Sequence, residues 1–428
     1  MDEEKQLSFL KNIINDIFNN HGNINYENIH EVYNYILETI EMIEPEYNLE
    51  LINFNFNNLI KCVFIPNSDF KGKIFYDKDS IIIPKKYKKL NKQLYTLANI
   101  PQPEQRSVEW FDMRKNMLTA STAAKAIGEC KYGKPKDLIL DKLGLGKQFK
   151  GNIFTHHGVK YEEIATKIYE HIYDVKVDEF GLLPHTSTPK INFIGASPDG
   201  ITNCFKLDNT FNDKMGRMIE IKCPYTRKIK TKGEIDNDIC PHTYWCQIQQ
   251  QLECCDLELC DFWQCKINEY TDRNIWLESK IETNFKEEQD VDVNIPLNCQ
   301  KGMIIQLMPK NSNNILDAKY LYPDNLNMSL YEYDQWVLEK ISNFFKTKLS
   351  YKYYFDKILY WELQTSHNIT INRNKKWFNT VLPKFKETWD KVLYYREHMD
   401  EAELLIKKKK KRKKKEKKIS ELFIDSDE

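Results

Sequence analysis

The chain has 428 residues, with 63 lysines and arginines, 63 aspartates and glutamates, and a formal net charge of zero. Its hydrophobic content of 41%, with 13% aromatic residues, supports a folded core and excludes wholesale disorder. No run approaches the roughly 18 apolar residues of a membrane span, and the N-terminus is acidic and then amphipathic, unlike a secretory signal. We therefore expect an intracellular protein.

The zero net charge hides a separation of charge along the chain. Residues 407–418 contain eleven basic residues and one acid, and the last ten residues contain four acids. Without these segments, residues 1–406 carry 52 basic and 58 acidic side chains. A dense basic tail binds polyanions by counterion release, so we expect non-specific DNA binding by Lys407, Lys408, Lys409, Lys410, Lys411, Arg412, Lys413, Lys414 and Lys415. A nuclear-import signal and a solvated run without a partner are the alternatives.

The first hundred residues are expected to form a mostly helical domain of unknown role. Two amphipathic helices are predicted within residues 1–50, because apolar residues recur there at helical spacing. Two short strands are predicted after them, at 73–76 and 81–84. Pro101 and Pro103 then mark a domain boundary.

Residues 101–270 are expected to form the core domain. Helical periodicity covers 107–116, 120–128, 135–143 and 156–174. Strand-like segments follow at 175–183, 191–196, 200–204, 218–222 and 259–267, with one helix at about 244–254. This order predicts an α/β (α+β) fold with a mixed central sheet flanked by helices.

A C-terminal helical and mixed extension, residues 271–405, is expected to pack on this core. Helices are predicted at 329–347 and 376–398, and strands at 303–307 and 357–363. The last helix is expected to continue into the tail. Residues 406–428 are predicted to be a basic and then acidic disordered tail.

Three short segments carry candidate chemistry. Glu162 lies in a helical run, Asp199 lies in a Ser-Pro-Asp-Gly turn, and Glu220 and Lys222 lie in an Ile-Glu-Ile-Lys strand, where they face one side. Carboxylates are the ligands that Mg²⁺ prefers, and a nearby lysine positions or deprotonates a water, which suits phosphodiester hydrolysis. Each segment alone has an ordinary interpretation as a turn, an ion pair or a solvated helix face.

Taken in order, these segments resemble the PD-(D/E)xK nuclease signature. Their surroundings resemble the lambda-exonuclease or YqaJ-like viral recombinase family over about residues 106–266, which implies a restriction-endonuclease-like core. The similarity begins at Trp110-Phe-Asp-Met-Arg114 and Leu118-Thr-Ala-Ser121, and ends at Tyr244-x-x-Gln247-Ile-Gln249. An apparent hairpin at 207–215 departs from the shortest family members.

The resemblance implies roles for the matching residues. The implied Mg²⁺ ligands, which would also accept Mn²⁺, are Asp199, Glu220, Glu162 and the backbone carbonyl of Ile221. The other implied catalytic residues are Lys222 and Gln249, with Gln247 as the alternative to Gln249. Arg114 and Ser121 would hold a DNA 5′-phosphate, since a guanidinium makes bidentate phosphate contacts; a surface ion pair is the alternative for Arg114.

The implied function is a Mg²⁺-dependent deoxyribonuclease, in the form of a 5′→3′ exonuclease that processes duplex ends for recombination, repair or replication. An endonuclease, an RNA-degrading nuclease and a non-catalytic DNA-binding or virion protein are the alternatives. The implied partners are DNA, a single-strand annealing or replication protein, and further copies of the chain, without a membrane. The heavy use of Asn, Ile, Lys and Tyr, with few glycines and prolines, indicates an AT-rich coding genome. Together with the resemblance it implies a large DNA virus, with the protein acting in the host cytoplasm, the virion or the host nucleus.

Six of the eleven cysteines crowd into residues 240–265. No two cysteines of the sequence have the C-x₂-C spacing, which disfavours zinc and iron–sulfur sites. We expect reduced thiols that pack as small hydrophobic side chains. Whether these cysteines bind anything is left open at this stage.

Overall fold

The computed structural model describes residues 81–103, 107–146, 151–185, 191–279 and 294–406. All of these residues belong to one compact unit, Phe70–Glu428. The helices expected within residues 1–50, the strand expected at 73–76 and the basic tail lie outside the described residues. The domain limits near 101 and 271 stay predictions.

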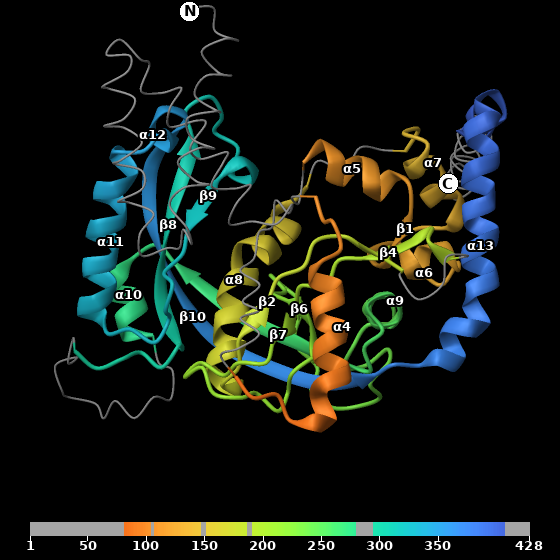
Figure 1. Ribbon diagram of the computed structural model, residues 1–428. Coiled ribbons are helices and arrows are strands. Elements are labelled where there is room, and N and C mark those ends of the chain that lie inside the picture. The colour runs from red at the N-terminus through yellow and green to blue at the C-terminus, as the bar shows by residue number, and fades with distance from the viewer. Residues whose placement is uncertain (1–80, 104–106, 147–150, 186–190, 280–293, 407–428) are drawn as a thin grey trace, which may run out of the picture. The chain divides into compact units, whose positions relative to one another are not determined.

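A seven-stranded mixed sheet forms the centre of the described unit (Figure 1). Its strand order is β2-β5-β6-β7-β10-β8-β9. The β6–β7 pair is parallel and the other pairs are antiparallel. The strands are β2 (Val177–Asp178), β5 (Gly200–Thr202), β6 (Met218–Lys222), β7 (Leu259–Tyr270), β8 (Lys301–Pro309), β9 (Lys319–Leu321) and β10 (Tyr353–Asn372). The expected mixed sheet flanked by helices is confirmed.

A second sheet contains three short strands. Its order is β1 (Leu118–Thr119), β4 (Ile194–Ala196) and β3 (Leu183–Pro184), with β1 parallel and β3 antiparallel to β4. Residues 197–199 connect β4 directly to β5 of the large sheet. Asp199 therefore lies where the two sheets meet.

Two helices cover opposite faces of the centre of the large sheet. α8 (Ile153–Tyr173) packs its buried side chains against Ile219 and Ile221 of β6. α9 (His242–Cys255) packs on the other face, against Met218 of β6 and Phe262 of β7. Side chains alternate along a strand, so β6 is apolar toward α8 and presents Glu220 and Lys222 on the side of α9.

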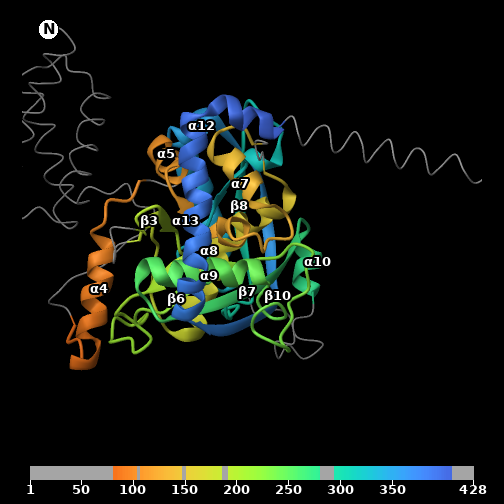
Figure 2. The same cartoon turned by 90° about the vertical axis from the view of Figure 1, so that its right-hand side faces the viewer.

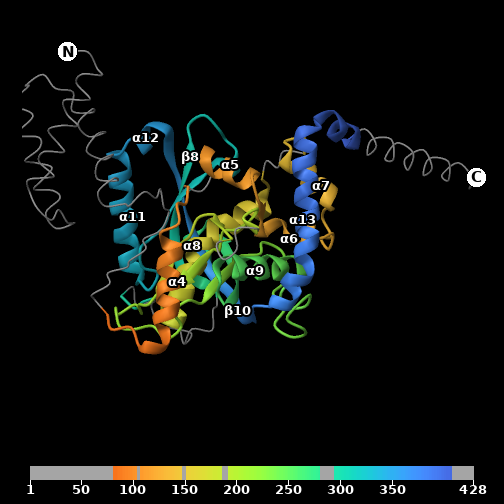
Figure 3. The same cartoon turned by 45° about the vertical axis from the view of Figure 1, so that its right-hand side comes forward.

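Further helices surround this three-layered centre. α4 (Lys88–Ala98) packs Leu94 and Leu97 into the apolar cluster under α9, while α10 (Arg273–Glu278), α11 (Leu330–Phe345) and α12 (Leu349–Lys352) lie along β8 and β10. Figures 2 and 3 show the long C-terminal helix α13 (Lys375–Glu397) beside the group of short helices that precedes α8. The remaining helical elements are α5 (Val108–Lys115), α6 (Ala123–Ala126), α7 (Pro135–Lys142), η1 (Lys85–Tyr87), η2 (Ala120–Thr122) and η4 (Ile315–Asp317).

Three sequence predictions about elements are wrong. The residues 81–84 form no strand, because Ile81 and Ile83 pack against the core as irregular chain before a 3₁₀ turn. The predicted segment 175–183 is split into the short strands β2 and β3. The predicted last helix is not continuous, because the backbone leaves the helical region at His398 (φ −127°, ψ 61°), and helical residues resume at 399–406, where the described residues end.

The region 301–372, expected to lie in an extension on the core, supplies three strands of the large sheet. β10 alone has 20 residues and pairs with β8 along its first half and β7 along its second half. It runs across the molecule in Figure 1 toward the start of α13.

Among the described residues, no helix is both long enough and apolar enough to cross a membrane.

The packing of β6 against α8 predicts a large cost for a cavity at Ile219. This side chain has no exposed surface, so Ile219→Ala should lower the free energy of unfolding by about 2–5 kcal/mol, as measured in urea. Ile275→Ala is the matched control, because Ile275 is 60% exposed and should change stability by less than about 0.5 kcal/mol. Equal effects of the two substitutions would contradict this packing.

Candidate active site

The Glu220 carboxylate lies in the interior of the protein with no exposed surface. Its Oε1 accepts hydrogen bonds from Lys222 Nζ and from Gln247 Nε2, the latter at 2.7 Å. Its Oε2 accepts from Gln251 Nε2 at 2.8 Å. A buried carboxylate needs such donors to keep its charge, and here both oxygens have them.

Asp199 is held against the same strand by the backbone. Gly200 pairs with Ile219 in the β5–β6 ladder, and the Ile221 N–H donates to Asp199 Oδ2 at 2.7 Å. Burial raises the pKa of the Asp199 carboxyl well above its usual range, and the nearby charge of Glu220 raises it further. The structure thus brings Asp199 and Glu220 together, as the sequence pattern predicted.

Glu162 approaches this pair from α8. Its neighbour Tyr161 accepts a hydrogen bond from Cys223 Sγ at 3.5 Å through the backbone carbonyl, which places this part of α8 at the end of β6. The charge of Glu162 also raises the pKa of Asp199, after burial and Glu220. Three carboxylates from a helix, a turn and a strand therefore act on one another electrostatically.

Lys222 is the cation of this group. Burial alone would favour its neutral form, but the Glu220 and Asp199 carboxylates outweigh burial and raise the pKa of Lys222 above its ordinary value. Its Nζ also donates to the Ile221 carbonyl at 3.1 Å. The lysine is therefore charged at neutral pH and lies beside the carboxylates.

The donor set fits a divalent cation. Carboxylate and carbonyl oxygens are hard ligands of the kind that Mg²⁺ and Mn²⁺ take. Burial and then the charges of Glu220 and Glu162 raise the pKa of Asp199, and the Lys222 ammonium only partly offsets them. Glu162, Asp199, Glu220 and the Ile221 carbonyl are the residues that would hold such an ion.

The expected position of Gln249 beside this site is wrong. Its Nε2 donates to the Asn372 carbonyl at 3.0 Å, and its Oε1 accepts from the Asn374 N–H at 2.6 Å, so it joins β10 to α13. Gln247, the alternative, contacts Glu220, and so does Gln251. Residues four apart share a helix face, whereas a step of two turns the side chain by about 200°. That spacing was the signal for Gln251, which sequence reasoning missed.

Arg114 and Ser121 lie close together, and both precede the carboxylates in the sequence. Arg114 Nη2 donates to Ser121 Oγ at 3.5 Å, and the guanidinium lies 4.4 Å from the centre of the Trp110 ring. Thr119 Oγ1 and Ser121 Oγ are 3.4 Å apart. The structure therefore brings the two expected phosphate-binding residues into one group.

Two further cations, Lys142 and Arg396, join this group, and sequence reasoning missed both. Lys142 Nζ donates to the Arg114 carbonyl at 2.5 Å, and Arg396 Nη2 donates to the Lys115 carbonyl at 2.6 Å. Burial, followed by the charges of Arg114 and Arg396, lowers the pKa of Lys142 to about 7. Crowded cations that repel one another favour an anion as their partner. We call Arg114, Ser121, Lys142 and Arg396 the basic cluster.

Comparison with known proteins identifies part of the chain. Residues 109–258 match the family model of the YqaJ-like viral recombinase domain. This range contains the carboxylates, Lys222 and most of the basic cluster, and it agrees with the YqaJ-like domain that the motifs resemble.

One curated relative is the uncharacterized protein R354 of Acanthamoeba polyphaga mimivirus, which is 38% identical over 332 residues. The match covers 75% of this chain and 58% of the relative, so the chain spans less than two thirds of the length of that protein. The large DNA virus inferred from the sequence is in line with this relative.

Solved structures of two exonucleases are also similar. The alkaline exonuclease LHK-Exo of Laribacter hongkongensis is 17% identical, with 71% of this chain and 99% of that chain covered and a TM-score of 0.33. A phage-related exonuclease of Haemophilus somnus 129PT is 14% identical, with 67% and 96% covered and a TM-score of 0.29.

The pairing of Glu220 predicts how its neighbours affect stability without added metal. Lys222→Met should lower the free energy of unfolding by about 3–5 kcal/mol, because it leaves a buried carboxylate without its cation. The double variant Glu220→Gln/Lys222→Met should recover most of that loss, since position 220 then carries no buried charge that needs a cation. Urea unfolding in EDTA measures both, and a double variant no more stable than Lys222→Met would contradict the pairing.

Proposed function

We propose that this chain, which contains a YqaJ-like viral recombinase domain at residues 109–258, is a Mg²⁺-dependent nuclease that degrades duplex DNA from its ends in the 5′→3′ direction. The observation that carries the proposal is the group formed by Asp199, Glu220 and Lys222 around the Ile221 backbone, with Glu162 acting on it from α8. A binding or virion protein has no need of three carboxylates and a lysine at one point.

The metal, when bound by these carboxylates, would supply a polarised phosphate and a more acidic water. The residues of the chain have separate tasks. Gln247 and Gln251 hold Glu220 in one orientation, and the Ile221 N–H holds Asp199. Lys222 stays protonated beside them, because its pKa is raised. Of the two roles expected for this lysine, its charge favours positioning the attacking water and offsetting the negative charge that develops on the phosphate.

The basic cluster supports the preference for a 5′-phosphorylated end. A terminal phosphate carries up to two charges and strong acceptor oxygens, which suit a guanidinium, a hydroxyl and an ammonium together. Arg114 and Ser121 lie within 3.5 Å of each other, and Lys142 donates to the Arg114 backbone. The direction of degradation rests on this cluster.

Affinity for the rest of the duplex would come from local positive charge. The lysines at 85–92 that lie on η1 and α4 are exposed, and their helix packs its apolar side into the core. Backbone phosphates bind such surfaces without regard to sequence. Replicating viral DNA inside the host cell is the substrate that fits a viral recombinase domain, and an annealing protein or further copies of the chain are proposed partners.

Lys222→Ala tests the proposed chemistry. The variant should lose about 10²- to 10⁴-fold in the rate of hydrolysis of linear duplex with Mg²⁺, while it still binds DNA. Lys228→Ala, which removes an exposed lysine on the segment after β6, is the control and should retain activity. Closed circular duplex should resist the wild type. Full activity of the Lys222→Ala protein would overturn the assignment.

The pKa of Lys142 predicts how end preference depends on pH. Lys142 carries its charge below about pH 7 and loses it above, so it attracts phosphate less strongly at higher pH. The ratio of kcat/KM for 5′-phosphorylated over 5′-hydroxyl duplex should therefore fall between about pH 6.5 and pH 8.5. The ratio cancels the pH dependence of the chemistry, which both substrates share.

Lys142→Met should flatten that profile and lower the ratio at the acidic end. Lys125→Met is the matched control, because Lys125 lies on the neighbouring α6 and pairs with Asp141 at 2.9 Å. A wild-type ratio that does not change with pH, or a Lys142→Met profile identical to the wild type, would remove Lys142 from the phosphate site.

A further inference from the structure

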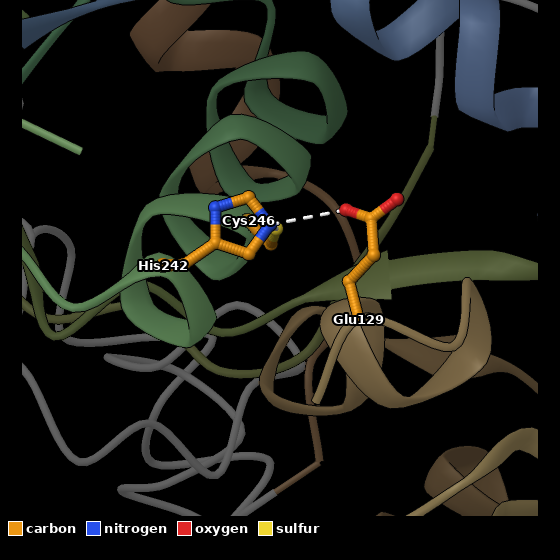
Figure 4. A group of neighbouring side chains, drawn as sticks. All are labelled: Glu129, His242 and Cys246. Carbon is orange, nitrogen blue, oxygen red and sulfur yellow. Dashed lines mark hydrogen bonds and ion pairs between the residues drawn. The ribbon is translucent and has the colours of Figure 1, made fainter. Parts of the chain in front are cut away.

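A second group of candidate metal ligands lies apart from the residues proposed for catalysis. Among the described residues, Glu129, His242 and Cys246 form one such group, with one ligand atom of each within 4.8 Å of the others. Figure 4 shows the His242 ring and Cys246 on one side of α9, with Glu129 reaching toward them from another segment. The expected packing role of the cysteines does not account for this group.

Local structure explains how the three residues meet. His242 is the first residue of α9 and Cys246 follows four positions later, so the two side chains share one helix face. Glu129 lies just after the turn that ends α6, directly after the left-handed Gly128 (φ 83°). Cys246 has no exposed surface, whereas His242 and Glu129 are partly exposed at the edge of the site. One side of the group therefore faces solvent.

The distances suit a tetrahedral ion. His242 Nε2 lies 3.4 Å from Cys246 Sγ and 3.0 Å from Glu129 Oε2. Zinc bond lengths of about 2.3 Å to sulfur and about 2.0–2.1 Å to nitrogen or oxygen place neighbouring tetrahedral ligands about 3.3–3.6 Å apart. Small side-chain adjustments would bring the three atoms to a common centre.

The opposite edge of the imidazole is also arranged as in zinc sites. His242 Nδ1 lies 2.9 Å and 3.0 Å from the two oxygens of Asp236. Metal-binding histidines almost always direct their second nitrogen to such a carboxylate, which fixes the tautomer and orients the ring. Lys384 Nζ lies 3.5 Å from Glu129 Oε1, the oxygen that the imidazole does not contact. Nε2 is thus the imidazole atom that lies beside both Cys246 Sγ and Glu129 Oε2.

A histidinium between two carboxylates is the competing explanation. It accounts for Asp236 and Glu129 but gives no role to the buried thiol beside Nε2. A sulfur, a nitrogen and one carboxylate oxygen form a set that suits Zn²⁺ better than Mg²⁺. This chemistry also separates the group from the all-oxygen site at Glu220.

We propose that Glu129, His242 and Cys246 bind a zinc ion, with water in the fourth position and Asp236 orienting the histidine. Binding would displace the thiol proton of Cys246. The ion would join the first turn of α9 to the turn after α6. Because Gln247 follows Cys246 and holds Glu220, the zinc would fix the part of α9 that supports the active site without contacting the substrate. The proposal does not depend on nuclease activity.

The test compares two buried cysteines of α9 in the full-length protein. Cys246 and Cys254 both have no exposed surface and lie in one apolar cluster, but only Cys246 belongs to the group. Wild type and Cys254→Ala, dialysed against zinc and then metal-free buffer, should retain about one zinc per chain by mass spectrometry. Cys246→Ala and His242→Ala should retain none, and Asp236→Asn should bind zinc about 10- to 100-fold more weakly.

Cobalt provides a readout that does not depend on activity or on zinc content. Co²⁺ added to the metal-free wild type should give a thiolate-to-metal charge-transfer band and visible bands of tetrahedral coordination, and Cys246→Ala should lack the charge-transfer band. Circular dichroism checks that each variant is folded, and Asp236→Asn keeps the test informative if Cys246→Ala fails to fold. A wild type without zinc and without the cobalt bands, or a folded Cys246→Ala that binds zinc as tightly as Cys254→Ala, would overturn the proposal.

Discussion

The buried charge of Glu220 is the constraint on which the rest of the site depends. A fully buried carboxylate on an interior strand of a sheet is shielded from bulk water, so the protein must supply its donors. One comes from Lys222 on the same strand, and two come from Gln247 and Gln251 on α9. This requirement places α9 across that face of β6, rotated about its axis so that Gln247 and Gln251 face Glu220. The apolar residues on the opposite side of β6 meet α8, which carries Glu162.

The same arrangement connects parts of the chain that are distant in sequence. α13 lies against α6, α7 and α9, and it contributes Arg396 to the basic cluster and Lys384 to the surroundings of Glu129. The position of α9 is thus held on one side by Glu220 and on another by contacts with α13. The basic cluster is proposed to bind a phosphate, and Glu129, His242 and Cys246 are proposed to bind zinc. Both groups lie next to elements that support the carboxylates.

Sequence reasoning located the parts of the site that depend on residues close together in the sequence. The alternation in Ile-Glu-Ile-Lys predicted the limits of β6, and the turn at 197–199 placed Asp199 beside it. Gln249 was assigned wrongly because a motif names a residue type and not the direction of its side chain, which depends on helix rotation. Lys142 and Arg396 were missed because they reach the backbone carbonyls of Arg114 and Lys115 only through the packing of α7 and α13. The pair His242-x₃-Cys246 was visible as a spacing, but its third member, Glu129, is 113 positions away.

Binding of Mn²⁺ to the full-length protein, followed by electron paramagnetic resonance, tests the central claim most directly, since it probes the carboxylates without requiring turnover. The wild type should bind Mn²⁺ that Mg²⁺ displaces, because Asp199, Glu220 and Glu162 offer oxygen ligands to either ion. Glu220→Gln keeps the size of the side chain and removes its charge, and it should abolish or greatly weaken that displaceable binding. A Glu220→Gln protein that remains folded and binds the same amount of Mg²⁺-displaceable Mn²⁺ would contradict the account.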